Sequence, residues 1–285
     1  MEILLNSKPA DIILNTEKTL GDVLSGIELW ISSTGNRISK IYADGKEISG
    51  QDLEKAFDWE IKNITKLEIY VSLWRDLAIE ALETLLASCT AWEDTPFDER
   101  KQIVSAWVES PAARFLTTDI GDLSQLAGLF FSGEGLSAGD LTILIEERLR
   151  ELKDPNRELG NAEVLVKTIS ERMEELPLDM QTGKDQRAAE TILLFSRIAE
   201  KLFRVFFIFK SEGLSMDDFT IDDLPAATFI SEFNAALLEL SAAYENQDIV
   251  LAGDVAEYEL APRISKLYIA LKLLTNSHIP VISKP

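Results

Sequence analysis

The character of the chain changes within one stretch, Thr65-Lys66-Leu67-Glu68-Ile69-Tyr70-Val71, which runs directly into Ser72-Leu73-Trp74-Arg75. Apolar and polar residues alternate along the first segment, and this two-residue period predicts a half-buried β-strand. From Leu73 onward, apolar residues recur three and four positions apart, which is the period of an amphipathic helix. The expected fold is therefore α+β, with a sheet domain at residues 1–72 and a mostly α-helical bundle at residues 73–285.

The sheet domain carries the signals of a hairpin, a helix and further strands. Residues 1–5 alternate between apolar and polar, and the turn signals after them predict a returning strand at residues 11–15. Thr19 is expected to cap a short helix. Two more strands are expected at residues 38–42 and 65–71. Hairpin, helix and then strands is the element order of a β-grasp.

Three segments of this domain resemble ubiquitin-like β-grasp domains: the start at Met1, the run Lys40-Ile41-Tyr42-Ala43-Asp44-Gly45-Lys46-Glu47-Ile48, and residues 65–71. The resemblance implies the β-grasp fold and a partner-binding patch on the sheet, where aromatic residues suit an interface core. The matching positions are Tyr42, Glu68 and Tyr70. Residues 72–75 replace the flexible diglycine tail, so conjugation to substrates is not expected. The alternative is that both tyrosine rings pack against the helical part of the same chain.

Seven segments of the helical region have the three-and-four spacing of amphipathic helices. They are residues 73–92, 97–109, 141–153, 162–176, 186–210, 224–245 and 249–274. The stretches Ser137-Ala138-Gly139-Asp140 and Thr182-Gly183-Lys184-Asp185 both fit the capping pattern in which a Ser or Thr precedes an acidic residue by three positions. Asp154-Pro155-Asn156-Arg157 is the clearest internal linker.

The helical region also contains two similar decapeptides. Residues 134–143, EGLSAGDLTI, resemble residues 212–221, EGLSMDDFTI, and each copy follows a phenylalanine-rich segment. The similarity suggests two related helical units at residues 73–154 and 155–275. Convergent helix-capping chemistry between two buried helices is the alternative explanation.

Composition limits the classes of partner. The 285 residues include 28 Lys+Arg and 49 Asp+Glu, for a formal net charge of −21. Phosphate backbones and anionic membranes repel such a protein, so we expect neither nucleic acid nor a membrane as partner. A basic protein partner fits better, although the charge can also serve solubility alone. The pattern specifies no oligomeric state.

The chain lacks the marks of secretion or membrane insertion. One cysteine, Cys89, excludes an internal disulfide framework and suits a reducing compartment. The N-terminus has no basic and apolar signal-like run. The most apolar stretch, residues 191–210, carries four charged side chains, so it is expected to be a buried core helix. We therefore expect a cytoplasmic protein.

Motifs for catalysis, metals and cofactors are missing from the pattern, and we expect no catalytic residue, no metal site and no cofactor. The one histidine, His278, lies in a polar tail without a positioned partner. Cys89 follows apolar residues and is expected to be a small buried hydrophobe. Gly183-Lys184-Asp185 lacks the upstream glycine and the Ser/Thr of a phosphate loop.

The most distinctive helical stretch places several carboxylates before a proline. Asp254, Glu257 and Tyr258 fall on roughly one helical face, and Pro262 is expected to kink or divide the helix. One interpretation is an acidic face that docks a basic partner helix. The alternative is a solvated face, or hydrogen bonds that fix a helical hairpin.

Three functions follow as hypotheses. The first is a non-catalytic adaptor or scaffold that binds a protein through the sheet patch or the acidic face. The second is a helical export or assembly chaperone, for example a motility accessory factor, which would shield an apolar partner helix in a groove lined by residues 126–131 or 203–209. The third is an enzyme that uses carboxylates such as Asp254 and Glu257 within an enclosing pocket.

Overall fold

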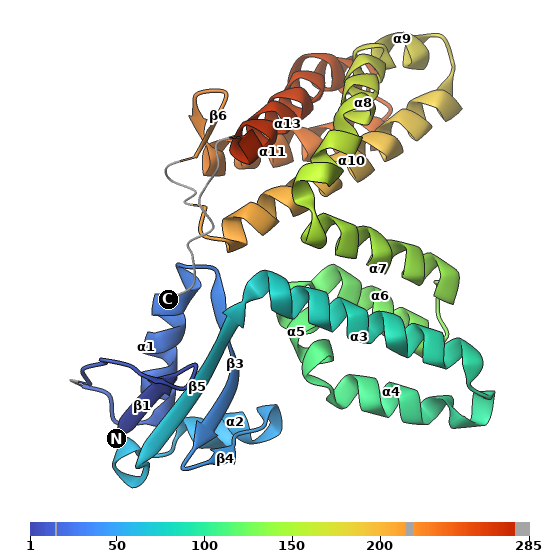
Figure 1. Cartoon of the computed structure of the whole chain (residues 1–285). Helices are drawn as coiled ribbons and strands as arrows, with labels where there is room; N and C mark the ends of the chain where they lie inside the picture. Colours follow the sequence, from blue (N-terminus) through green and yellow to red (C-terminus); the bar gives the residue numbers. More distant parts are fainter. Residues whose placement is uncertain (15, 215–218, 277–285) are drawn as a thin grey trace. The chain divides into compact units, whose positions relative to one another are not determined.

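The computed structural model describes residues 1–14, 16–214 and 219–276, apart from the side chains of Gln51, Phe97 and Asn276 (Figure 1). The chain divides into two compact units. Unit 1 holds Met1–Lys153 together with Ser211–Gly213, and unit 2 holds Asp154–Lys210 and the chain from Leu214. Unit 2 begins at the linker expected at residues 154–157. Among the described helices, none is both long and apolar enough to cross a membrane.

Unit 1 opens with a five-stranded mixed sheet in the order β2-β1-β5-β3-β4. The strands are β1 (Glu2–Leu5), β2 (Lys8–Pro9), β3 (Asn36–Ala43), β4 (Lys46–Glu47) and β5 (Lys66–Leu73). The central strands β1 and β5 are parallel, and the other pairs are antiparallel. The expected α+β class with an N-terminal sheet domain is confirmed.

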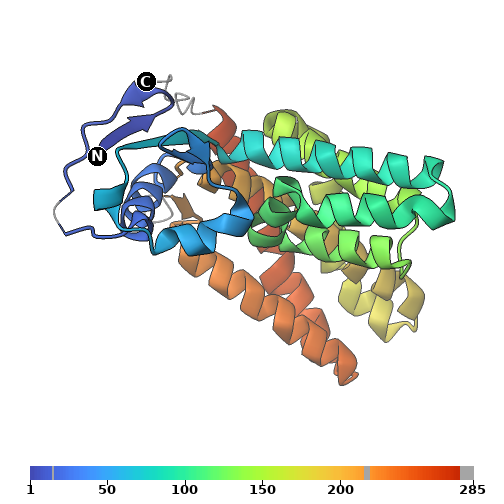
Figure 2. The same ribbon diagram turned by 90° about the horizontal axis from the view of Figure 1, so that it is seen from below.

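One helix, α1 (Leu20–Ser32), lies against one face of this sheet in both views (Figure 1 and Figure 2). Its buried side chains meet Ile41, Leu67 and Ile69 of the strands in one hydrophobic core. Thr19 begins α1 as expected, because its hydroxyl accepts from the Asp22 backbone N–H and the Asp22 carboxylate accepts from the Thr19 N–H. A short α2 (Gly50–Phe57) and a 3₁₀ turn, η1 (Ile61–Asn63), complete the domain.

The predicted strand at residues 11–15 is wrong over residues 11–14, and residue 15 lies outside the described residues. Asn6 and Ser7 both have positive φ, 48° and 65°. This is the geometry of a two-residue turn that pairs the strands at once, so the returning strand is β2. Pro9 has no N–H to donate, and the Ala10 N–H donates to the Ile3 carbonyl at 2.9 Å just after it.

The helices of unit 1 follow the last strand without a linker. They are α3 (Trp74–Asp94), η2 (Phe97–Glu99), α4 (Arg100–Glu109), α5 (Pro111–Asp119), α6 (Gly121–Ser132) and α7 (Ala138–Lys153). The Trp74 backbone N–H donates to the Gly35 carbonyl at 2.9 Å, and its indole N–H donates to Asp119 at 3.0 Å. These bonds join the sheet, α3 and the end of α5. The capping expected at residues 137–140 is confirmed, since the Asp140 N–H donates to the Ser137 hydroxyl.

Unit 2 is helical with one small hairpin. Its elements are α8 (Pro155–Glu174), α9 (Leu176–Gln181), α10 (Asp185–Ser211), β6 (Thr220–Ile221), β7 (Leu224–Pro225), α11 (Ala226–Glu245), α12 (Ile249–Asp254), the π-helix η3 (Val255–Leu260) and α13 (Ala261–Asn276). Asp154 caps α8 and Pro155 takes its first position. Phe195, Phe229 and Phe233 lie at the centre of the core.

Two details differ from the expectations for this region. The predicted Thr182 cap is wrong, because the Thr182 hydroxyl donates back to the Leu178 carbonyl at 2.7 Å and so ends α9. The second decapeptide includes residues 215–218, which lie outside the described residues. Over the described part, Thr142 and Ile143 are helical whereas Thr220 and Ile221 form a strand. A duplication therefore stays a prediction.

Candidate functional site

The three sheet positions singled out above lie together on one face of the sheet. Tyr42 on β3 is directly opposite Glu68 on β5, and Tyr70 follows two residues later on the same strand. Because strand side chains alternate, these residues point away from the face that α1 covers. The two rings meet edge to face, with centroids 5.7 Å apart and planes at 77°. All three side chains are half-buried. We call them the tyrosine patch.

Polar contacts hold the tyrosine patch in place. The Lys66 ammonium lies 2.9 Å from the Glu68 carboxylate, and the Tyr70 hydroxyl lies 3.1 Å from the Ser7 hydroxyl. The hydrogen bond to Glu68 raises the pKa of Lys66 above its usual value. The patch therefore presents two fixed aromatic rings beside a compensated charge pair.

The acidic stretch near Pro262 coincides with the π-helix η3. Asp254 precedes η3, while Glu257 and Tyr258 belong to it. A hydrogen bond to the Glu257 carboxylate raises the pKa of the exposed Tyr258 hydroxyl, and the nearby charge of Asp254 adds to the shift. The three residues are thus neighbours, as expected. Pro262 lies in the first turn of α13, and the chain stays helical from α12 through η3 into α13. The expected division of the helix at Pro262 is therefore wrong, and a π-helical stretch precedes the proline instead.

The same stretch offers no enclosed site for carboxylate catalysis. Asp254 and Tyr258 are exposed, so water surrounds both side chains. Within the part of the chain that the structure describes, no group of three or more His, Cys, Asp and Glu side chains is placed to hold a metal ion. His278 lies outside the described residues.

Cys89 is buried in α3, as its sequence context predicted. Burial raises the pKa of its thiol from 9.0 to about 11. At mildly alkaline pH, we expect a disulfide reagent to label the native thiol at least about a hundredfold more slowly than the urea-unfolded thiol, because the thiolate is the nucleophile. The folded state also holds this proton more tightly, so stability falls as the pH rises from 9.0 toward about 11. Equal labelling rates would contradict the buried position.

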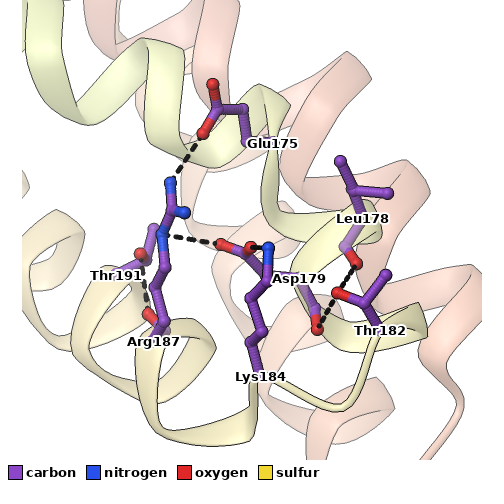
Figure 3. A network of polar contacts seen from close by, with 7 residues as sticks. All are labelled: Glu175, Leu178, Asp179, Thr182, Lys184, Arg187 and Thr191. Atoms are coloured by element: carbon purple, nitrogen blue, oxygen red, sulfur yellow. Dashed lines mark hydrogen bonds and ion pairs between the residues drawn. The ribbon is translucent and has the colours of Figure 1, made fainter.

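A buried charge network in unit 2 has no counterpart in the sequence interpretation (Figure 3). Asp179, near the end of α9, is 2% exposed. Its carboxylate lies 3.2 Å from the Lys184 ammonium and 3.1 Å from Arg187 Nε, and Arg187 also reaches Glu175 at 2.7 Å. The Lys184 N–H donates to the Asp179 carbonyl. Together these contacts fix the turn between α9 and α10, which gives residues 183–185 a structural role.

An open groove lies among three helices of unit 1, with a volume of about 580 Å³. Gly128 and Phe131 of the segment 126–131 line it. The 203–209 segment is different, since Val205 and Phe206 are buried in the unit 2 core. We name the site the α4–α6 groove, and its lining is Val104, Trp107, Val108, Ala113, Arg114, Thr117, Thr118, Ser124, Gly128, Phe131 and Ser132.

Comparison with known proteins finds two partial matches. The family model described as TP0873 N-terminal domain matches residues 1–72. A model described as a domain of unknown function, DUF8042, matches residues 158–270. No curated protein and no solved structure matches the chain. The first match ends within β5, and the second lies within unit 2 apart from residues 211–213.

Proposed function

We propose that residues 1–72 form a ubiquitin-like β-grasp and that the protein is a cytoplasmic adaptor, which binds a partner protein through the tyrosine patch. Two features of the sheet support the β-grasp: the central parallel pair β1–β5, and the helix α1 on one face. The observation that carries the adaptor function is the half-exposed pair of rings at Tyr42 and Tyr70 on the other face.

The chemistry of the patch suits protein recognition. Tyrosine rings bring a large apolar area with few rotatable bonds, and interface cores are enriched in them. The Lys66–Glu68 pair gives the patch a polar border, where a partner can exchange hydrogen bonds without burying an isolated charge. Binding by strand addition is disfavoured, since the edge strands β2 and β4 have two residues each. The face, rather than an edge, is therefore the proposed contact.

A second contact is proposed at Asp254, Glu257 and Tyr258. Asp254 is exposed and Glu257 is half-buried, and their carboxylates suit a basic helix of a partner at the π-helix η3. Contacts between exposed charges weaken as salt rises, because the Debye length shrinks. Binding at this acidic face should therefore be lost at moderate salt, whereas binding at the tyrosine patch should persist.

The adaptor proposal predicts the effect of the double variant Tyr42→Ala/Tyr70→Ala. Used as bait in cytoplasmic extract, wild-type protein should retain a stable partner that the variant loses. Truncation of two central aromatic contacts should weaken binding by at least about 2 kcal/mol, or roughly thirtyfold. The measurement is quantitative affinity capture at low and at moderate salt.

The matched control is Trp30→Ala, which removes an aromatic side chain that is 62% exposed on α1. This control should retain the partner. If the double variant retains the partner at moderate salt, the tyrosine patch is not the contact. Two results together would place the contact at the acidic face instead. Wild type and both aromatic variants would lose the partner at moderate salt, and Asp254→Asn/Glu257→Gln would lose it even at low salt.

One observation favours the helical chaperone as a second candidate. Residues Gly128 and Phe131 of the expected segment do line an open groove, the α4–α6 groove. The carboxylate-enzyme hypothesis has no such support, since Asp254 is exposed.

A further inference from the structure

We infer that the α4–α6 groove docks an amphipathic helix of a partner protein, and that this helix carries one carboxylate beside its apolar stripe and a basic outer face. The inference deepens the chaperone candidate and rests on it. It does not depend on the tyrosine patch, which lies on a different part of unit 1.

The floor of the groove is apolar and fixed. Trp107 of α4 and Phe131 of α6 are almost completely buried, and their ring centroids are 6.1 Å apart. Val108 also lines the groove and is 62% exposed. A preformed apolar floor with an exposed apolar rim is the surface that an amphipathic helix covers with residues three and four apart.

A glycine leaves room for the backbone of an occupant. Gly128 lies within α6, is exposed, and a Cβ added to it would meet no atom within 4 Å. Glycine inside a helix is less favourable than alanine, so the position lowers helix stability without any packing gain inside the chain. Ala113 and Ser124 also present small side chains. These residues allow a helix to approach more closely than larger side chains would.

The guanidinium of Arg114 indicates which charged side chain the docked helix should carry. Arg114 lines the groove, and its guanidinium lies against Gly50 at the start of α2. Among the described side chains, no acceptor forms a hydrogen bond or ion pair with this guanidinium. A guanidinium fork pairs with a carboxylate through two parallel hydrogen bonds. Because the protein carries a net charge of −21, the rest of the occupant is expected to be basic.

Other occupants fit these observations less well. Small-molecule sites bury most of the ligand surface, whereas this groove is open along one side and would leave such a ligand in contact with water. A second copy of the chain carries the same large negative charge, which opposes association. A basic amphipathic helix would bury its apolar stripe on the groove floor, and the negative charge of the protein would attract its basic residues.

The test is a selection of displayed peptides of about four helical turns on the full-length protein. Selected sequences should place apolar residues three and four apart, with one Asp or Glu among them and Lys or Arg outside. For a synthesised selected peptide, Gly128→Leu should lower affinity at least about tenfold by filling the groove, because one large side chain displaces several apolar contacts. Wild-type protein should bind the selected peptide with Glu about tenfold more tightly than the same peptide with Gln at that position, and Arg114→Gln should bind both peptides equally.

The controls separate blocking from unfolding and from the adaptor function. Gly160→Leu makes the same change at an exposed glycine of α8 with equally open space, and it should leave peptide affinity unchanged. Gly128→Leu should melt no lower than wild type, since Gly128 is exposed, an added Cβ meets no atom within 4 Å, and leucine favours a helix more than glycine does. Tyr42→Ala/Tyr70→Ala should bind the peptide normally, so a failed adaptor proposal would leave this result intact.

Three outcomes would overturn the inference. The first is selected peptides that bind wild type and Gly128→Leu equally. The second is a preference for Lys over Glu beside the apolar stripe. The third is a dimer of the wild-type chain that Gly128→Leu converts to monomer by light scattering, because a second copy would then occupy the groove.

Discussion

Replacing Phe233 by alanine is expected to lower the free energy of unfolding of unit 2 by about 3–5 kcal/mol. The Phe233 ring is fully buried in α11. It stacks on Phe195 at 6.1 Å, meets Phe203 edge to face at 5.1 Å and contacts Phe229 at 6.3 Å. Truncation would remove the shared member of all three pairs and leave a cavity among α10 and α11 that the remaining rings cannot fill.

The distribution of tryptophan makes this experiment specific to one unit. All five tryptophans, at positions 30, 59, 74, 92 and 107, belong to unit 1. Urea unfolding followed by tryptophan fluorescence therefore reports on unit 1, while circular dichroism follows the helices of both units. Phe233→Ala should move part of the dichroism transition to lower urea and leave the fluorescence transition in place. Leu238→Ala, at an exposed site of the same helix, should change stability by less than about 0.5 kcal/mol.

Two results would contradict this account of the core. One is a cost below about 1 kcal/mol for Phe233→Ala, which would mean that the ring is not enclosed. The other is an equal shift of both transitions, which would mean that the two units unfold as one cooperative block.

Replacing Lys201 by alanine is expected to lower the stability of unit 2 by about 3 kcal/mol. Lys201 of α10 and Glu158 of α8 form an ion pair at 2.8 Å, with side chains only 15% and 10% exposed. Removing the ammonium leaves the carboxylate desolvated, with Asn161 as a weaker remaining donor at 3.3 Å. Glu158 lies in the first turn of α8, where the helix dipole offsets part of the cost.

Two further variants separate desolvation from the attraction of the pair. Lys167→Ala removes an exposed pair with Glu171 on the same helix α8, and it should cost no more than about 0.5 kcal/mol. Glu158→Leu/Lys201→Met replaces both charges by apolar groups and should recover most of the stability lost in the single variant. Similar losses for Lys201→Ala and Lys167→Ala, measured by circular dichroism in urea, would show that the inner pair is solvated.

The sequence predicted much of the sheet, because alternation along a strand and a helix cap depend only on residues close together in the chain. The alternation at residues 65–71 placed Tyr70 and Glu68 on one face, and the resemblance brought Tyr42 to the same patch. The Thr19 cap also depends on neighbouring residues alone. The returning strand was predicted too late in the chain, because Asn6 and Ser7 adopt positive φ and make a two-residue turn.

The groove could not be predicted, because it depends on how three helices pack. Two of them, α5 and α6, were missing from the interpretation, although Ser110 before Pro111 is a recognisable helix start. The spacing of Leu123, Ala127 and Phe130 on α6 is also helical. Even with both helices assigned, no local signal places Arg114 beside Phe131. The Asp179 network was missed for the same reason, since its cations approach across a turn.

The central claim, that a partner binds at the tyrosine patch, is tested most directly by photo-crosslinking from the patch itself. A benzophenone amino acid in place of Tyr70 should yield one major adduct with a partner protein in cytoplasmic extract, and the same group in place of Trp30 should yield none of it. The adduct should persist at moderate salt. Adducts of equal yield from both positions, or an adduct formed only when the probe replaces Tyr258, would contradict the claim.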